Sequence, residues 1–411
     1  MMDYERWRSN NVKEALKTRR VVVISGARQT GKTTLAKEIR DKNSVFMPLD
    51  KKNILAAALE DPTSFIKNES GTMIIDEIQK APDLVPEIKY TVDNNKRPGQ
   101  YLLTGSANIK SLPSVSESLA GRVKTIRLRP LTQGEILRKK PAFLELAFAG
   151  EFPKRIAGYD KDAIFDLAFR GGYPETMLLK TPKERKDWHR DYIDTLIARD
   201  LKDIANIKRQ SALRELIKIL ASWSGKFMSL PPICTALGLS KPTAESYISA
   251  LEALYLFEEV PPWIKTDYDR VGRSPKTYAT DTGLMASVLG WHKKEVMLNT
   301  DRAGKLMETF VFQELAAQID LSNEYSLYQY RDRKGREIDF IIEREDEALI
   351  GVEVKSGHNV SKEDFASQIW FKENIIKGTK PYNGIVLYSG EHILSFGDGM
   401  LAVPIAALWV H

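Results

Sequence analysis

Residues 21–33 read VVVISGARQTGKT, and this stretch decides the fold of the first third of the chain. Val21–Ile24 is a β-branched run that predicts a buried strand, and a helix is expected from Lys32 to about Asp41. Between them, Gly26–Thr33 satisfies G-x-x-x-x-G-K-[ST], in which two glycines let successive backbone N–H groups face a polyphosphate. The following helix adds the positive end of its dipole. The context predicts a phosphate-binding loop; the alternative is a glycine turn that only caps a helix.

The predicted nucleotide-binding residues are those of the loop and of the first turn of its helix: Gly26, Ala27, Arg28, Gln29, Thr30, Gly31, Lys32, Thr33 and Thr34. Lys32 is expected to reach the β- and γ-phosphates as a catalytic cation. The Thr33 hydroxyl is expected to bind Mg²⁺.

An acidic pair follows the apolar run Met73–Ile75. If that run is a parallel strand, Asp76 lies at the carboxyl edge of the sheet, beside the loop, where it can hold Mg²⁺ through water. Glu77 is then the natural residue to polarise the attacking water. An Asp-Glu pair after a strand is common, and alone it indicates a solvated turn; the phosphate-binding loop is what favours a metal site.

Three further residues are candidates for catalysis. Thr104 and Ser106 lie at the end of a strand expected beside the acidic one, so either hydroxyl could hydrogen-bond the γ-phosphate or the water. The alternative for both is a helix cap or a turn. Arg122 could stabilise charge on a phosphate held by a neighbouring subunit, as an arginine finger does, and the alternative is a surface cation after a glycine turn.

The remaining pattern predicts a parallel α/β domain and then mainly helical segments. Further strands are expected at residues 45–49, 72–76, 101–104 and 124–128, and a helix at 83–94. After Pro130, helices are expected at 163–169 and 188–201. Helices at 213–223, 232–237 and 242–256, followed by strands at 257–260 and 276–279, resemble a winged helix-turn-helix. A helix from Gly304 and a three-stranded meander at 325–331, 336–343 and 348–355 complete the pattern.

The meander carries carboxylates and a lysine in the order that metal-dependent phosphodiester cleavage uses. Glu353 and Lys355 are two apart on one strand and therefore share a face. A three-residue turn over residues 345–347 puts Asp339 directly across from Glu353, whereas a two-residue loop would put them on opposite faces. Glu308, on the preceding helix, could supply a third carboxylate, and Gln368 could orient substrate. The alternative is a cross-strand ion pair on a solvated face.

Basic residues suggest contacts with nucleic acid. Lys241 begins the expected recognition helix, and further cations surround the expected wing: Lys265, Arg270, Arg273 and Lys276. A helix N-terminus and a basic wing suit phosphates and grooves, although winged helices also serve protein contacts. The basic turn at residues 331–336 lies beside the carboxylates, and its alternative is a solvated turn.

Five motifs in order resemble a prokaryotic AAA-type P-loop ATPase family: GARQTGKTT, MIIDEIQ, LLTGSA, SLAGR followed by PL, and GGYPE. The resemblance covers nearly the whole chain. It implies ATP as the nucleotide, a core followed by a helical lid, ring or dimer assembly, and a C-terminal domain similar to restriction endonucleases. The D…E-x-K nuclease pattern maps onto Glu308, Asp339, Glu353 and Lys355.

The expected architecture is therefore α/β, with an AAA-type parallel-sheet core at residues 1–135 and a helical lid at 136–205. A winged helix-turn-helix follows at 206–285, and a small α+β nuclease-like domain at 286–411.

Composition is consistent with a multidomain protein of the cytoplasm. The chain has 411 residues, a net charge of +6 and one cysteine, so an internal disulfide is impossible. Its five histidines show no zinc-ligand spacing. The start lacks the apolar region of a signal peptide, and no apolar run is long enough to span a membrane. The small basic surplus permits a nucleic-acid partner without demanding one.

Two functions follow from these patterns. The first is a Mg²⁺-dependent ATPase that couples its nucleotide state to binding or cleavage of DNA, with a second Mg²⁺ or Mn²⁺ at the nuclease-like site. The alternative is an ATP-dependent switch or scaffold whose C-terminal domain binds a protein or DNA without cutting it. A third possibility, nucleotide binding without hydrolysis, conflicts with Glu77.

Overall fold

The computed structural model describes residues 4–68, 70–106, 121–200, 209–264 and 274–410. The chain divides into two compact units. Unit 1 comprises residues 1–130 and 250–256, and unit 2 comprises residues 131–249 and 257–411. The contacts thus group the segments predicted as lid, winged helix and nuclease-like domain into one unit, except for residues 250–256 of the predicted winged helix, which belong to unit 1. The finer division stays a prediction.

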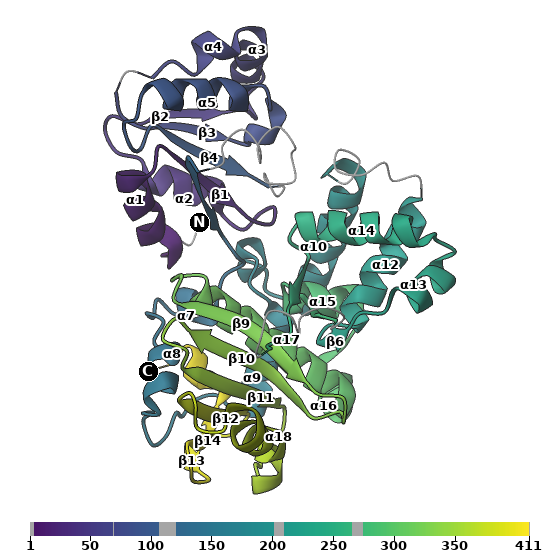
Figure 1. The fold of residues 1–411 in the computed structure, drawn as a ribbon. Coiled ribbons are helices and arrows are strands. Elements are labelled where there is room, and N and C mark those ends of the chain that lie inside the picture. The colour runs from purple at the N-terminus through teal and green to yellow at the C-terminus, as the bar shows by residue number, and fades with distance from the viewer. Residues whose placement is uncertain (1–3, 69, 107–120, 201–208, 265–273, 411) are drawn as a thin grey trace. The chain divides into compact units, whose positions relative to one another are not determined.

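Unit 1 is built on a five-stranded parallel sheet (Figure 1). Its strands are β1 (Val21–Ser25), β2 (Val45–Pro48), β3 (Met73–Asp76), β4 (Tyr101–Gly105) and β5 (Val123–Arg127). They lie in the order β2-β3-β4-β1-β5, and every neighbouring pair is parallel. The predicted α/β core is confirmed, and β4 does lie next to the acidic strand β3.

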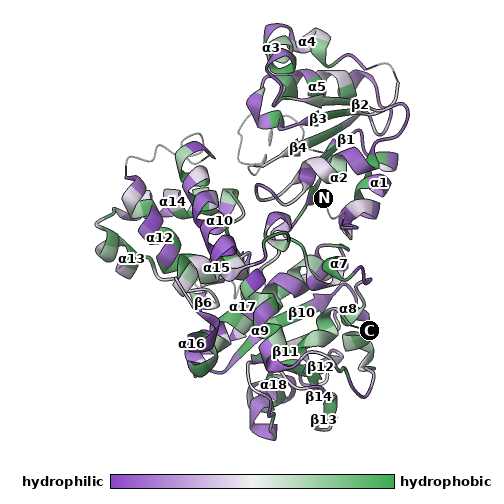
Figure 2. Cartoon of the chain, turned by 180° about the vertical axis from the view of Figure 1, so that it is seen from behind, coloured by the Kyte–Doolittle hydropathy of each residue, from purple (hydrophilic) through white to green (hydrophobic). Residues whose placement is uncertain are grey.

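Helices cover both faces of this sheet. They are α1 (Arg8–Thr18), α2 (Lys32–Ile39), α3 (Lys52–Glu60), α4 (Pro62–Phe65) and α5 (Leu84–Asn94), with a 3₁₀ turn η1 (Ile78–Lys80). Along β1, Val22 and Ile24 pack in one apolar core with α1 and α2, while Val21 and Val23 pack in a second core with α5. Because both faces are covered, the central strands β1, β3 and β4 are buried at every position and mainly apolar, as their green colour in Figure 2 shows, whereas the edge strand β5 carries Lys124, Thr125 and Arg127.

The first part of unit 2 is helical. Its helices are α7 (Gln133–Ile136), α8 (Phe143–Ala149), α9 (Lys161–Arg170) and α10 (Pro182–Thr195), with a 3₁₀ turn η3 (Pro174–Met177) and a π-helical turn η4 (Leu196–Asp200). Thr181 begins α10 with a capping box to Glu184, which satisfies free N–H groups of its first turn.

The segment predicted as a winged helix contains the expected helices and both expected strands, together with one strand more. Its elements are α12 (Gln210–Ser222), β6 (Lys226–Phe227), α13 (Leu230–Leu237), α14 (Lys241–Ala253), β7 (Phe257–Val260) and β8 (Lys276–Ala279). The strands pair antiparallel in the order β6-β8-β7. The two-residue strand β6 was not predicted, because it is too short to show a period.

A six-stranded mixed sheet forms the end of the chain. It follows α15 (Thr282–Val288), α16 (Lys293–Leu298) and α17 (Thr300–Ile319), and its strands are β9 (Tyr325–Arg331), β10 (Glu337–Arg344), β11 (Leu349–Lys355), β12 (Tyr382–Tyr388), β13 (Leu394–Ser395) and β14 (Met400–Pro404). The order is β13-β14-β12-β11-β10-β9. The buried helix α17 packs against one face. The other face packs against a segment that contains η6 (Lys362–Phe365), α18 (Ala366–Phe371) and the π-helical turn η7 (Lys372–Ile376), and a 3₁₀ turn η8 (Ile405–Leu408) ends the fold.

The GGYPE motif at residues 171–175 is a packing element. Gly172 donates its N–H to Asp281 (2.6 Å) and accepts from the N–H of Leu131 (2.6 Å). A Cβ on Gly172 would lie 2.2 Å from the Leu131 carbonyl oxygen, so only glycine fits there. The motif therefore anchors the first residues of unit 2.

Candidate nucleotide-binding and carboxylate–lysine sites

The loop between β1 and α2 adopts backbone angles that are readily accessible only to glycine at two of its positions. Gly26 (φ +146°) and Gly31 (φ +95°) both have positive φ, and Gln29 adopts the left-handed region with φ 62°. A Cβ on Gly26 would lie 2.2 Å from the carbonyl oxygen of Leu128, which follows β5. The close approach of these two backbones thus demands glycine at the first position of the motif.

Lys32 lies inside this loop and is 4% exposed. Its ammonium donates to the carbonyl oxygens of Gly26 (3.0 Å) and Ala27 (2.7 Å). A cation held against the loop backbone is suitably placed for the phosphates that such loops bind.

Asp76, the last residue of β3, is hydrogen-bonded both to the end of the phosphate-binding loop and to β4. Its carboxylate accepts hydrogen bonds from the Thr33 hydroxyl (2.9 and 3.1 Å) and from the Thr104 hydroxyl (2.5 Å). A carboxylate and a hydroxyl this close form an oxygen donor set of the kind that Mg²⁺ takes in nucleotide sites. The residues present therefore fit a magnesium ion held by Thr33 and Asp76.

Glu77 begins a turn in the left-handed region, with φ 62° and ψ 48°. Its N–H donates to the Thr104 hydroxyl (3.1 Å), and its carboxylate accepts from the Gln79 amide. The same Gln79 amide donates to the Ser106 hydroxyl (3.0 Å). The structure thus brings four of the predicted side chains, those of Asp76, Glu77, Thr104 and Ser106, to the carboxyl ends of β3 and β4.

Gln79 was not predicted, although it stands in the MIIDEIQ motif. It links Glu77 to Ser106 and so fixes the orientation of the acidic side chain. A polar residue two positions after the acid is the signal that could have identified it.

Arg122 forms an ion pair with Asp93 at the end of α5. A second guanidinium nitrogen donates to the other carboxylate oxygen of Asp93 (3.0 Å). Hydrogen bonding to Arg122 holds the pKa of Asp93 below its usual value. The role of Arg122 as an arginine finger stays a prediction.

The register of the meander agrees with the three-residue turn. Phe340 pairs with Val352 and Glu343 with Leu349, so continuing the ladder by one residue puts Asp339 opposite Glu353. Asp339 also accepts from the N–H of Val354 (3.0 Å). A register shift between β9 and β10 falls at residues 338–341, beside Asp339, and such irregularities are frequent next to functional sites.

Lys276, the first residue of β8, is the centre of this carboxylate group. Its side chain is 1% exposed, and its ammonium lies 2.9 Å from Glu308, 2.5 Å from Glu337 and 3.2 Å from Asp339. The prediction that Lys276 meets nucleic acid as part of a basic wing is therefore wrong in this conformation, because the side chain is buried and ion-paired.

The elements around Glu308 enclose its carboxylate. The Tyr278 hydroxyl donates to it (2.7 Å), and a Cβ on Gly225 would lie 2.9 Å from it. Burial, followed by the charge of Asp339, raises the pKa of Glu308 to about 7. Burial alone would lower the pKa of Lys276, but its surroundings, including Glu308 and Asp339, raise it well above the usual value, so this lysine stays charged.

Glu353 and Lys355 form the outer part of the group. The Lys355 ammonium lies 3.3 Å from Glu353 and 3.6 Å from Asp364. Burial, followed by the charge of Asp339, raises the pKa of Glu353 well above its usual value. The four predicted residues Glu308, Asp339, Glu353 and Lys355 thus do converge, with Lys276 and Glu337 added to them.

Other predicted residues are engaged elsewhere. Gln368 is fully buried and donates to the Ile385 carbonyl (3.0 Å), which makes it part of the core rather than a substrate ligand. Lys241 is exposed and lies 3.7 Å from Glu245, one helical turn further along. The predicted wing residues Lys265, Arg270 and Arg273 lie outside the described residues.

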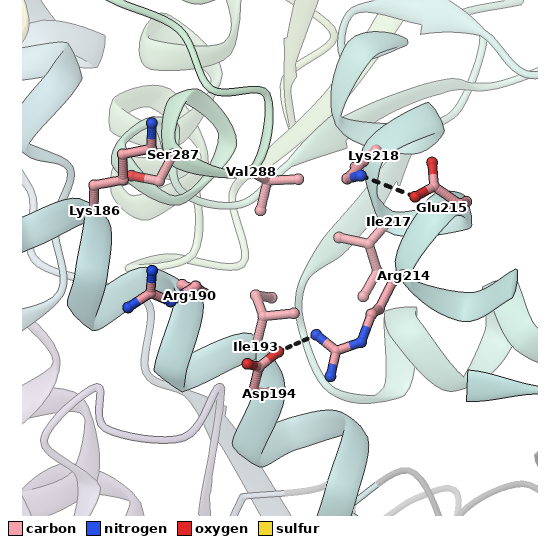
Figure 3. A pocket seen from close by; sticks show the side chains of 10 residues that line it. All are labelled: Lys186, Arg190, Ile193, Asp194, Arg214, Glu215, Ile217, Lys218, Ser287 and Val288. Atoms are coloured by element: carbon pink, nitrogen blue, oxygen red, sulfur yellow. Dashed lines mark hydrogen bonds and ion pairs between the residues drawn. The ribbon is translucent and has the colours of Figure 1, made fainter. Parts of the chain in front are cut away.

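A cavity of about 290 Å³ opens between α10, α12 and α15 (Figure 3). Ile193, Ile217 and Val288 line it, and Arg214 on α12 pairs with Asp194 on α10. None of the predicted site residues lines this cavity.

Within the described ranges, no group of three or more His, Cys, Asp or Glu side chains is arranged to hold a metal ion. A second metal at the carboxylate–lysine group thus finds no support in this conformation. Nor does any helix among the described residues have the length and apolar character needed to cross a membrane.

Comparison with known proteins finds relatives of unassigned function. An uncharacterized protein of Mycobacterium tuberculosis is 28% identical over 396 residues, which cover 96% of this chain and 82% of the relative. An uncharacterized protein of Methanocaldococcus jannaschii is 22% identical over 350 residues, covering 81% of this chain and 74% of the relative.

Among solved structures, the RuvB Holliday junction branch migration motor of Thermotoga maritima matches with 18% identity and a TM-score of 0.27, over 63% of this chain and 90% of RuvB. AMPPCP-bound DnaA of Aquifex aeolicus matches with 17% identity and a TM-score of 0.30, over 60% of this chain and 86% of DnaA. Values this low do not bear on the function of this chain.

Three family models match separate stretches of the chain. Residues 161–295 match a domain of unknown function (DUF8612), and residues 303–408 match another (DUF4143). Residues 18–137 match a model described as an AAA domain, and these residues hold the parallel sheet, the phosphate-binding loop and the acidic strand. Residues 18–137 therefore form a domain with the AAA-type P-loop fold.

Proposed function

We propose that the chain is a magnesium-dependent ATPase whose nucleotide site is the loop at residues 26–34 together with Asp76 and Glu77. The contact that carries the proposal is the pair of hydrogen bonds from Thr33 and Thr104 to Asp76, which brings the loop, the acidic strand and the intervening strand β4 to one point. Bound there, Mg²⁺ would neutralise charge on the phosphates.

Each residue has a defined role in this proposal. Lys32 contacts the β- and γ-phosphates, Thr33 and Asp76 hold the metal, and Glu77 orients and polarises water. Thr104 fixes Asp76 through its hydroxyl and Glu77 through that residue's N–H. One side chain on β4 therefore sets the relative positions of the metal ligand and the acid.

The Lys32→Ala variant tests this site. It is expected to lose at least about 100-fold in ATP affinity, because a charge-assisted contact to phosphate disappears from a buried position. Binding of labelled ATP is measured by equilibrium dialysis with Mg²⁺. Lys37→Ala, on the exposed face of the same helix, should bind as the parent does. Tight ATP binding by Lys32→Ala would show that the loop at residues 26–34 is not the nucleotide site.

For the C-terminal domain we propose recognition of a nucleic acid without cleavage. The observation that speaks against cleavage is Lys276, whose buried ammonium lies among Glu308, Glu337 and Asp339, where a nuclease would need a divalent cation. A fixed cation within about 3 Å of the carboxylates opposes a second cation at the same place. Nucleotide state would then control binding rather than cutting.

Labelled duplex, branched and single-stranded DNA, incubated with Mg²⁺ or Mn²⁺ and with or without ATP, should stay intact with the parent protein. Retention on a filter should detect binding that weakens steeply with salt, as phosphate contacts do. Cleavage that persists in Glu345→Ala, an exposed acid of the hairpin turn, but disappears in Glu353→Ala would make the domain a nuclease instead.

A further inference from the structure

Arg6 precedes α1 and is 7% exposed, which is unusual for a residue with a permanent charge. Its guanidinium donates through Nη1 to the carbonyl oxygen of Thr30 (2.6 Å) and through Nη2 to that of Arg129 (2.6 Å). Thr30 belongs to the phosphate-binding loop, and Arg129 follows β5. A single side chain therefore links three separate parts of unit 1.

The bond to Thr30 determines how the next peptide faces. In a trans peptide, the carbonyl of one residue and the N–H of the following residue point in opposite directions. With the Thr30 carbonyl held by Arg6, the N–H of Gly31 points to the other side of the peptide plane. In loops of this type, backbone N–H groups cradle the phosphates.

Because Gly31 has no side chain, the Thr30–Gly31 peptide can rotate more freely than a peptide next to another residue. Its φ of +95° needs glycine, and it begins α2 without any side-chain cap. The nearest atom that a Cβ there would meet is Nη1 of Arg6, at 3.6 Å. The guanidinium thus lies beside Gly31 and restricts the backbone conformations that this glycine can adopt.

We propose that Arg6 is a positioning residue for nucleotide binding, which orients the Thr30–Gly31 peptide so that the Gly31 N–H faces the phosphates. The bond to Arg129 fixes the guanidinium from its other side, so that the loop is held against the end of the sheet. This proposal rests on the proposed ATP site but concerns a residue outside its motif.

Arginine suits this role better than lysine. Its planar fork presents two donors at fixed separation, whereas an ammonium is a single point of charge on a flexible stem. A lysine side chain at this position would keep the charge yet could not hold both carbonyls with the same geometry. The variants Arg6→Lys and Arg6→Gln therefore separate charge from geometry.

The test is titration of the full-length parent and variants with a fluorescent ATP analogue and Mg²⁺, with the thermal midpoint measured in parallel. Arg6→Gln is expected to weaken binding about 10-fold to 100-fold, as loss of charge-assisted hydrogen bonds does. The affinity of Arg6→Lys for the analogue should lie between those of the parent and Arg6→Gln. Arg8→Gln is the matched control: Arg8 lies in α1 and donates to the carbonyl of Arg127 (3.3 Å), so its affinity should stay within about 2-fold.

A steady-state assay distinguishes positioning from general stability. The KM for ATP should rise with the dissociation constant in Arg6→Lys, while kcat at saturating ATP stays within about 3-fold, because only phosphate binding is impaired. Unchanged affinity in folded Arg6→Lys and Arg6→Gln would overturn the role of Arg6. Equal weakening in Arg8→Gln would overturn it too, since the effect would then belong to the helix. No binding by the parent would instead overturn the ATP site itself.

Discussion

The Glu77→Gln variant is expected to bind ATP as tightly as the parent protein and to hydrolyse it about 100-fold to 10,000-fold more slowly, the range that a positioned acid or base contributes. Glutamine keeps the shape of the side chain and can still contact Gln79, so the left-handed turn at residue 77 and its N–H bond to Thr104 should survive. Only the charge that polarises water is removed.

Release of phosphate under saturating ATP measures the rate, and equilibrium dialysis measures binding. Glu60→Gln, an exposed acid at the end of α3 in the same unit, should turn over ATP at the parental rate. If Glu77→Gln hydrolyses ATP like the parent, the acidic residue is not the one that activates water, and the turn is structural.

Replacing Lys276 with methionine should destabilise unit 2 by about 3–5 kcal/mol, the usual cost of removing one partner from a buried ion pair. The variant keeps the length of the side chain but leaves Glu308, Glu337 and Asp339 facing one another without a cation. Urea denaturation of the full chain, followed by circular dichroism, measures the loss. Lys334→Met, in the exposed basic turn, should change stability by less than about 0.5 kcal/mol.

The pH dependence of stability and a second substitution test whether the stability lost in Lys276→Met comes from the uncompensated carboxylates. The pKa of Glu308 is raised to about 7, and without Lys276 its neutral form is favoured further. A carboxyl group whose folded-state pKa is raised contributes stability that is complete below its unfolded pKa and is lost as pH rises through the folded pKa. Because the pKa of Glu308 is about 7 in the parent and higher without Lys276, the penalty in Lys276→Met should be smallest below pH 7 and should grow as the pH rises above 7. Adding Glu308→Gln should restore part of the stability. A loss under about 1 kcal/mol would show that the ammonium is dispensable.

The strands of the ATPase core could be predicted from the sequence because they are short runs rich in β-branched or other apolar residues, and the central ones, β1, β3 and β4, end at recognisable loops. The position of β4 beside β3 was also predicted, whereas the sequence left two lengths open for the turn between β10 and β11, and the structure has the one that puts Asp339 across from Glu353.

Contacts between distant segments could not be predicted in the same way. Lys276 lies 32 residues from Glu308 and 63 from Asp339 along the chain, and as part of a cation-rich stretch it looked like a surface residue. The one local signal was its spacing from Tyr278, since residues two apart on a strand share a face. Arg6 offers no local signal, because its partners are backbone carbonyls 24 and 123 residues away.

The buried ammonium among the carboxylates also limits how sequences of this kind can change by mutation. Loss of Lys276 alone leaves buried carboxylates without a counter-charge, and loss of the carboxylates alone leaves a buried ammonium without one. Either mutation alone therefore lowers stability until a second mutation compensates for it. A lineage that exchanged the lysine for a metal would have to cross that intermediate. Natural selection is therefore expected to replace these positions together or to keep them all.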